Sequence, residues 1–199
     1  LKALTGMEFD DFMLLDKLNT PSDELRGDMS KYLLYCDPFM GIFDARITDG
    51  VNTYYKELYN KLSSVKTTDD YKPYFESAAA LADVLSVKAE LGIKTRAAYL
   101  AGNTQKLKAI AKNDYTSAIN KLRAFHAAFR KSWFFENKPH GFDVQDSRLG
   151  GLIMRLESCR DRLLEFCENT DIEIPELSEP VLECKRFGTW SDIVTANVF

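Results

Sequence analysis

The chain has 199 residues, with 26 Lys or Arg against 30 Asp or Glu, so its formal net charge is −4. Hydrophobic residues make up 45% and charged residues 28%, proportions that are typical of a soluble globular protein and exclude a disordered or collagen-like chain. The acidic balance argues against a general nucleic-acid binder, which needs a basic face. No apolar run is long enough to predict a membrane-spanning helix.

The chain begins Leu1-Lys2-Ala3, without an initiator Met and without the regions of a signal peptide. We therefore expect a piece of a longer polypeptide or a processed form. The cysteines form no Cys-x-x-Cys pair, and the chain has only two histidines, so a structural zinc site is not expected. We expect reduced thiols and a cytoplasmic location.

Residues 1–48 are predicted to be irregular with short helices. Phe9, Phe12, Met13 and Leu15 form a brief apolar turn, and a polar loop follows over residues 19–28. Residues 31–44 (KYLLYCDPFMGIFD) are much more apolar than a surface loop and are interrupted by a proline and a glycine. This stretch predicts a buried connection that requires a partner surface.

From Asp49 onward, apolar residues recur every three or four positions, which predicts helices over residues 51–65, 74–100, 105–135 and 145–169. The apolar stripe of the second helix is mostly small and that of the third is bulky, so the two are expected to interlock. Pro175 and Pro180 bracket a short helix, and an apolar tail follows, with Trp190, Ile193, Val194, Val198 and Phe199. We predict an all-α fold: an antiparallel bundle of about four long helices, with an irregular, partly helical N-terminal segment and a C-terminal tail.

The sequence carries few motifs that indicate chemistry. The chain has no Gly-rich phosphate loop, no Gly-x-Ser-x-Gly and no His-Glu-x-x-His. The acidic pairs Asp10-Asp11 and Asp23-Glu24 are interpreted as surface residues. His126 is interpreted as a boundary histidine in preference to a catalytic base. No catalytic residue, metal site or cofactor is predicted.

Two further patterns leave alternatives open. Arg148, Arg155 and Arg162 recur every seven residues beside the seam of the fourth helix. They form either a solvated flank or a ridge that pairs with acidic groups on another domain. Trp133 either belongs to the core or offers a sugar-stacking platform.

Residues 133–152 combine aromatic side chains, both signs of charge and three glycines. Gly150 and Gly151 each cost a helix about 1 kcal/mol relative to Ala, so we expect a close backbone approach there. The stretch is either a tight helix crossing or a docking surface for another domain or a ligand.

Three segments carry a resemblance to a known family: residues 31–44, 133–152, and 82–92 with the sequence ADVLSVKAELG. Over most of its length the chain resembles the C-terminal helical region of a bacterial subgroup of glycoside hydrolase family 20, the β-N-acetylhexosaminidases. Members of that family catalyse on a (β/α)₈ barrel with an adjacent Asp-Glu pair, and the acetamido oxygen of the substrate is the nucleophile. This chain has no such series of strands and helices and no Asp-Glu pair in that context, so no catalytic residue is carried over.

The resemblance implies a non-catalytic accessory domain of a carbohydrate-metabolising hexosaminidase, inactive alone. Residues 1–48 would connect it to the absent barrel, and residues 49–199 would form the helical domain. Its partners would be the barrel of the same polypeptide and, through the parent enzyme, N-acetylhexosamine glycosides, with a homodimer as a further option. The candidates for domain docking or cleft lining are Trp133, Asn137, Lys138, Phe142, Asp146, Arg148, Tyr32, Tyr35 and Asp37. The alternative is a free-standing helical interaction or regulatory module.

Overall fold

The computed structural model of the chain describes residues 2–21 and 28–181. Every regular element in these ranges is helical, which confirms the all-α class. The Asp23-Glu24 pair, Cys184 and the apolar tail residues 190–199 lie outside the described residues. Within the described part, no helix is both long enough and apolar enough to cross a membrane.

The N-terminal part contains α1 (Lys2–Thr5), α2 (Phe9–Asp16), a 3₁₀ turn (Lys17–Asn19), α3 (Met29–Tyr35) and a second 3₁₀ turn (Asp44–Arg46). The helical part comprises α4 (Val51–Ser64), α5 (Lys72–Lys88), α6 (Leu91–Leu100), α7 (Thr104–Ala109), α8 (Thr116–Glu136) and α9 (Phe142–Glu168). The short helix predicted between two prolines is α10 (Pro175–Ser178).

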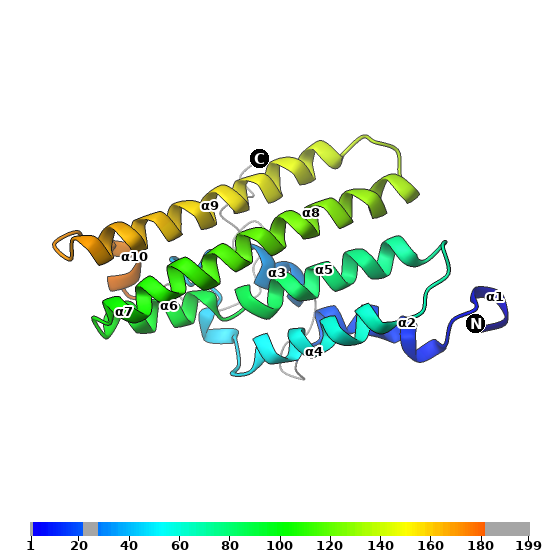
Figure 1. Cartoon of the computed structure of the whole chain (residues 1–199), viewed down its shortest axis with the longest axis horizontal. Helices are drawn as coiled ribbons and strands as arrows, with labels where there is room; N and C mark the ends of the chain where they lie inside the picture. The colour runs from blue at the N-terminus through cyan, green and yellow to red at the C-terminus, as the bar shows by residue number, and fades with distance from the viewer. Residues whose placement is uncertain (1, 22–27, 182–199) are drawn as a thin grey trace.

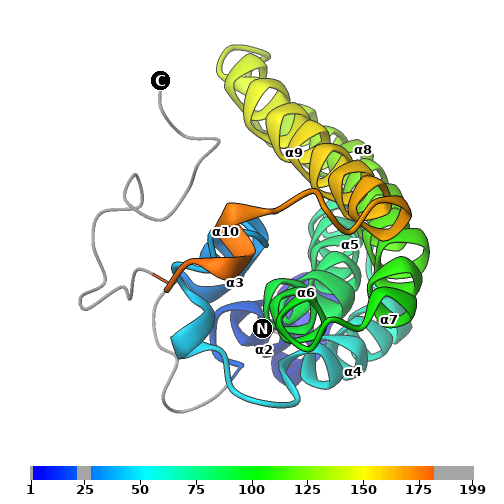
Figure 2. The ribbon, with the colours of Figure 1, turned by 90° about the vertical axis from the view of Figure 1, so that its left-hand side faces the viewer.

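The long helices α4, α5, α8 and α9 lie side by side in chain order, each antiparallel to its neighbour (Figure 1). Figure 2 shows that the row curves, with α3 and α10 on its inner side. In a closed four-helix bundle the first and last helices would meet, whereas here α4 and α9 lie at opposite edges of the row. The N-terminal segment and α10 fill the inner side, so the arrangement is an open curved row and differs in this respect from the predicted bundle.

The helix predicted over residues 74–100 is two helices, because the chain breaks between α5 and α6. At the break, the backbone N–H of Glu90 donates to the side-chain oxygen of Asn52 (3.1 Å), and a Glu90 carboxylate oxygen accepts from the N–H of Asn52 (3.0 Å). Asn52 lies in the first turn of α4, so this reciprocal pair ties the break to the start of that helix. The stripe of threes and fours runs through the break without interruption, which is why periodicity alone did not reveal it.

The helix predicted over residues 105–135 is also divided. A π-helical turn over residues 110–115 separates α7 from α8, and Asn103 caps α7 by accepting the N–H of Lys106 (2.9 Å). The extra residue of the π turn places Tyr115 in the core, where its hydroxyl lies 3.2 Å from Thr95 Oγ1.

The predicted apolar stripes form the core. Along α5, the break and α6, all six residues of the small stripe are buried: Phe75, Ala78, Ala82, Leu85, Ala89 and Gly92. On α9, the near-heptad seam is buried throughout: Leu149, Leu152, Leu156, Cys159, Leu163 and Phe166. The bulky stripe that ends on α8 is buried from Leu107 to Phe125, and its last two members, Phe129 and Trp133, are partly buried.

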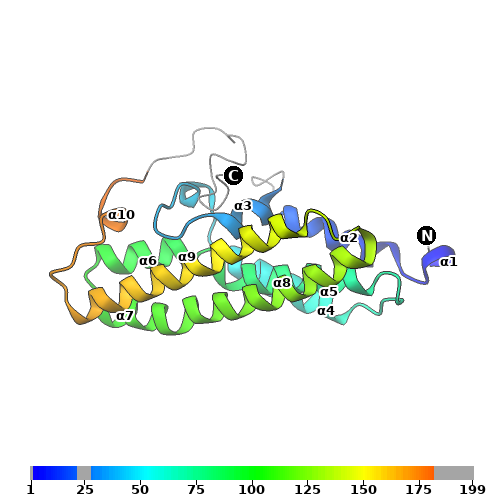
Figure 3. The same ribbon diagram turned by 90° about the horizontal axis from the view of Figure 1, so that it is seen from above.

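The apolar segment 31–44 finds its partner surface within this chain. Leu33, Leu34, Phe39 and Phe43 are buried in the same core cluster as residues of the long helices, and α3 packs on α5. Figure 3 shows α3 beside the row of long helices when the molecule is seen from above.

Candidate functional site

A network of ion pairs and hydrogen bonds, here called the node, attaches the inner segment (residues 31–44) to the row of helices. Its first member is Asp37. Asp37 follows α3 and is only 3% exposed. Its Oδ1 accepts the backbone N–H groups of Phe39 (2.8 Å) and Met40 (3.0 Å), so the carboxylate fixes the turn that Pro38 initiates. A buried carboxylate of this kind requires a charged partner.

Arg155 of α9 is that partner. Its Nε donates to Asp37 Oδ2 (2.5 Å) and a terminal nitrogen donates to Oδ1 (3.2 Å), a two-point contact that fixes direction as well as distance. Burial alone raises the pKa of Asp37, but the hydrogen bonds from Arg155 and the two backbone N–H groups outweigh it, so the pKa lies below its ordinary value.

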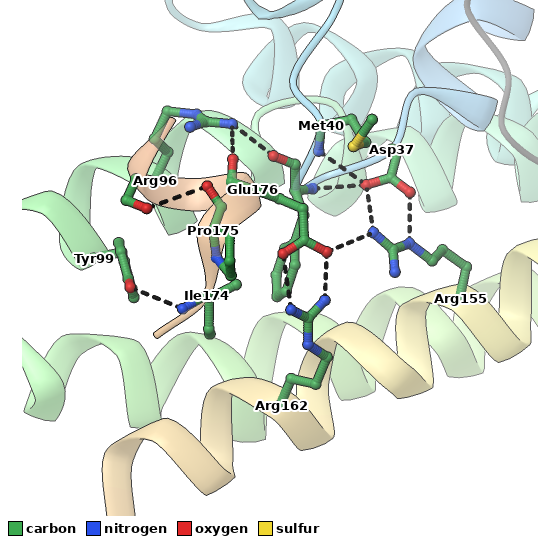
Figure 4. Close-up of polar contacts among 11 residues, drawn as sticks. Asp37, Met40, Arg96, Tyr99, Arg155, Arg162, Ile174, Pro175 and Glu176 are labelled. Carbon is green, nitrogen blue, oxygen red and sulfur yellow. Dashed lines mark hydrogen bonds and ion pairs between the residues drawn. The ribbon is translucent and has the colours of Figure 1, made fainter. Parts of the chain in front are cut away.

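Glu176 of α10 also belongs to the node, where it faces Arg155 and Arg162 of α9 (Figure 4). Its two carboxylate oxygens accept from Arg162 at 2.6 and 2.8 Å, and one of them lies 4.0 Å from Arg155. The hydrogen bonds from Arg162 lower the pKa of Glu176 to about 2. Both guanidinium groups also lie over the ring of Phe39, 5.6 and 5.3 Å from its centre.

The arginines that recur every seven residues on α9 therefore have a role that neither interpretation of the sequence included. Arg155 and Arg162 pair with acidic groups of this same domain, one on the inner turn and one on α10. Arg148, the first member, lies close enough to Tyr35 to oppose the effect of burial, which raises the pKa of Tyr35 to about 12.

Arg96 of α6 completes the attachment of α10. One terminal nitrogen donates to the carbonyls of Leu177 (3.0 Å) and Glu179 (3.3 Å), and the other donates to those of Phe39 (2.6 Å) and Glu176 (2.9 Å). A single side chain therefore satisfies carbonyl groups at the end of α10 and in the inner turn together. Figure 4 shows the contact of Arg96 with Glu176, with the Tyr99 hydroxyl accepting the N–H of Ile174 nearby.

Asp44 lies beside this node in a confined position. Burial raises its pKa to about 6, and its Oδ2 is buried with no hydrogen-bond partner among the described residues. Two glycines make the space: a Cβ added at Gly41 would lie 2.7 Å from Oδ2, and one added at Gly92 would lie 3.3 Å from Oδ1. A hollow of about 530 Å³, lined in part by Asp44, Arg96 and Leu100, opens next to it.

Lys88 of α5 also holds the inner segment in place. Its ammonium group is fully buried and donates to the carbonyls of Leu33 (3.0 Å) and Cys36 (2.8 Å), which lie at the C-terminal end of α3. These are carbonyl groups that the helix itself leaves without a donor. Burial lowers the pKa of Lys88.

The candidates from the turn between α8 and α9 form a separate aromatic cluster. Trp133 donates from Nε1 to the carbonyl of Lys138 (3.1 Å), and its ring centre lies 5.8 Å from that of the buried Phe142. Asn137 and Lys138 are exposed in the turn. Trp133 is therefore partly covered by its own turn, which favours the packing interpretation over a sugar platform.

The remaining candidates are divided between the two places. Asp146 lies near the turn, with Oδ1 2.6 Å from His126 Nε2, in agreement with a boundary role for that histidine. Tyr32 stacks on Phe43 in the inner segment, with ring centres 5.7 Å apart. The nine predicted residues therefore lie in two groups, Tyr32, Tyr35, Asp37 and Arg148 at the inner segment and the other five at the turn.

The expectation of a close backbone approach at Gly150 is wrong. No described atom would lie within 4 Å of a Cβ added there. The close approach is at Gly92 instead, where an added Cβ would lie 3.0 Å from the Pro38 carbonyl oxygen. Gly92 belongs to the small stripe, so the sequence did contain a signal.

Four residues of the site were not predicted from the sequence: Arg96, Lys88, Asp44 and Glu176. Nothing in their local spacing separates them from surface residues, because each acquires its role from another segment of the chain, 14 positions away for Glu176 and more than 50 for Lys88 and Arg96. In the part of the chain that the structure describes, no group of three or more His, Cys, Asp or Glu side chains is arranged to hold a metal ion.

The node can hold segments in place, because its charged groups are directed at carbonyls and carboxylates of the chain itself. The fold and the node together define an all-α domain whose inner face is closed by arginine-anchored segments. The family model described as the glycoside hydrolase 20C C-terminal domain matches residues 10–193. The chain therefore belongs to the glycoside hydrolase 20C C-terminal domain family, as the resemblance implied. No curated protein sequence matches it.

Proposed function

We propose that this chain is the non-catalytic C-terminal accessory domain of a β-N-acetylhexosaminidase-like glycoside hydrolase. It packs on the catalytic (β/α)₈ barrel of the same polypeptide and stabilises it. The observation that carries this proposal is the family match, which covers residues 10–193 and by its description refers to a C-terminal domain. The parent enzyme acts on N-acetylhexosamine glycosides, and this chain alone is inactive.

Residues 1–48 lead from the barrel into the helical domain of residues 49–199. The burial of Leu33, Phe39 and Phe43 among the long helices supports a connection that is fixed to the domain it enters. The Asp37–Arg155 pair attaches this connection to α9 as well, so the connection is held rigidly against the helical domain.

We further propose a bacterial, cytoplasmic enzyme of carbohydrate metabolism. Cys36, Cys159 and Cys167 are free thiols, which supports a reducing compartment. Burial raises the pKa of Cys36 to about 11 and that of Cys159 to about 12, so both stay protonated and unreactive near neutral pH.

The test uses the full polypeptide that contains this chain and 4-nitrophenyl N-acetyl-β-D-glucosaminide as substrate. We expect the full polypeptide to release nitrophenol and residues 1–199 alone to release none. In the full polypeptide, Asp37→Asn is expected to lower the temperature of thermal inactivation, while the surface variant Asp161→Asn leaves it unchanged. Hydrolysis by residues 1–199 alone contradicts the proposal, as does a full polypeptide that hydrolyses no N-acetylhexosaminide.

A free-standing helical interaction module is the competing function. It predicts that the reading frame containing this chain encodes no barrel upstream of Leu1. In that case the substrate assay is negative throughout, and the Asp37→Asn variant alters only the stability of the helical domain.

A further inference from the structure

Exposed apolar side chains gather at one end of the molecule. Nine large hydrophobic side chains are exposed among the described residues, and five of them lie on α2 or around the turn between α8 and α9: Phe9, Met13, Phe134, Phe135 and Val144. Figures 1 and 3 both place α2 and this turn toward the same end of the long axis. The other four, Met40, Leu100, Met154 and Ile172, belong to separate elements or loops.

A series of aromatic rings connects the two parts of this end. Phe12 of α2 lies 5.0 Å from Tyr71, Tyr71 lies 6.4 Å from Tyr74, and Tyr74 lies 6.3 Å from Phe135 between ring centres. The Tyr74 hydroxyl also donates to the Glu136 carboxylate, which joins the start of α5 to the end of α8. We call the resulting surface the aromatic end face, and it comprises Phe9, Met13, Tyr71, Tyr74, Phe134, Phe135 and Val144.

Clusters of exposed apolar side chains that are rimmed by polar residues are typical of interaction sites. Phe9 is 62% exposed and Phe135 is 53% exposed, although Phe12 of α2 and Phe125 of α8 pack against other rings. The two halves of the face come from segments far apart in the sequence, at residues 9–13 and 134–144. The fold therefore brings them together.

The described part of the chain begins at this same end. Lys2, the first described residue, lies in α1, beyond α2 at the end of the long axis (Figure 1). A domain joined through residue 1 is tethered beside the aromatic end face, and such tethering gives an effective concentration of about millimolar. The turn between α6 and α7 lies toward the opposite end of the long axis (Figure 3).

We propose that the aromatic end face is the surface on which the catalytic domain preceding residue 1 docks. This inference rests on the proposed function and adds which surface makes the contact. Segment 31–44, the other docking surface that the sequence suggested, is already packed against α5, α6 and α9 through Leu33, Arg96 and Arg155. The exposed phenylalanines would lose their contact with water on docking, which provides the driving force.

The test measures maleimide labelling of single introduced cysteines in the full polypeptide, with peptide mass spectrometry separating them from the native thiols. Phe9→Cys and Phe135→Cys report on the aromatic end face. Leu100→Cys and Met154→Cys are the matched controls, because those side chains are 64% and 61% exposed and lie elsewhere. All four variants are assayed for hydrolysis of the same aryl N-acetylhexosaminide.

We expect positions 9 and 135 to label at least ten-fold more slowly than positions 100 and 154 in the native polypeptide, and all four to label equally in denaturant. Equal native rates at all four positions overturn the inference even when hydrolysis is normal. Protection that disappears when the polypeptide is diluted to a monomer means that a second copy covers the face, and it overturns the inference as well. An absence of hydrolysis in the unmodified polypeptide refutes the proposed function instead.

Discussion

Asp37 and Arg155 lie 118 positions apart in the sequence, yet Arg155 Nε is 2.5 Å from Asp37 Oδ2. This pair joins the turn after α3 to the middle of α9 and so closes the inner side of the curved row. Because Asp37 also accepts two backbone N–H groups, the pair determines the shape of the turn as well as its position.

Replacing Asp37 with Asn should destabilise the domain strongly. The change leaves Arg155 without its carboxylate, and breaking such a buried pair costs about 2–4 kcal/mol, with the lower end favoured because Arg155 is partly exposed. Urea unfolding followed by circular dichroism measures the effect. Asp161→Asn, which removes a surface partner of Arg160, should change the free energy of unfolding by less than about 0.5 kcal/mol. Equal effects of the two substitutions would show that the Asp37–Arg155 pair does not hold the turn.

Two glycine-to-alanine substitutions should change the free energy of unfolding in opposite directions. A Cβ at Gly92 would lie 3.0 Å from the carbonyl oxygen and 3.2 Å from the Cα of Pro38, so backbone must move and stability should fall by about 1–3 kcal/mol. A Cβ at Gly150 meets no described atom, and the gain in helix propensity should raise stability by about 1 kcal/mol. Thermal melting of both variants beside the wild type checks this prediction. A stabilising Gly92→Ala would contradict the close approach of α6 to the inner turn.

Lys88→Met should destabilise the domain although it removes a buried charge. The substitution leaves the carbonyls of Leu33 and Cys36 without their donor, and an unsatisfied buried acceptor costs about 1–3 kcal/mol. Relief of the desolvation of the ammonium group offsets part of this, so we expect a net loss of about 1–2 kcal/mol. Lys94→Met, on the exposed side of α6, is the control and should be nearly neutral. A Lys88→Met variant as stable as that control would show that the two hydrogen bonds contribute little.

The Asp44→Asn substitution should have an effect that depends on pH. The folded pKa of about 6 lies above the ordinary value of 3.8, so the folded state binds a proton that the unfolded state does not bind between about pH 4 and 6. The contribution of Asp44 to stability therefore increases as the pH falls through about 6 and is lost as the pH rises. The free energy of unfolding of Asp44→Asn minus that of the wild type should be more positive at pH 7.5 than at pH 5, by about 1–3 kcal/mol.

Urea unfolding at both pH values measures this difference, with the exposed Asp10→Asn as the control. Arg96 and Lys88 are the cations near Asp44, and Asp37 is the nearby carboxylate. All three are kept unchanged in the experiment, because each of them affects the pKa of Asp44. A stability difference between Asp44→Asn and wild type that is the same at both pH values would mean that Asp44 titrates in the same range whether folded or unfolded.

The helices and their inward faces followed from the sequence, because burial on one side of a helix requires apolar residues every three or four positions. The seam from Leu149 to Phe166 is an example, since every predicted member is buried. The family was also evident from the sequence, and the match over residues 10–193 confirms it. The break at Glu90 and the π turn were not evident, because neither interrupts the apolar spacing.

The sequence by itself determined the helical class, the apolar stripes and the family to which the chain belongs. The tertiary structure alone decided which charged residues are buried and with which partners. Arg148, Arg155 and Arg162 have the same spacing and the same local surroundings, yet Arg155 pairs with a turn 118 positions earlier and Arg162 with a helix 14 positions later. The physical reason is that a charge is accepted in a protein interior only where a specific opposite group reaches it, and that meeting depends on how distant segments are placed in space.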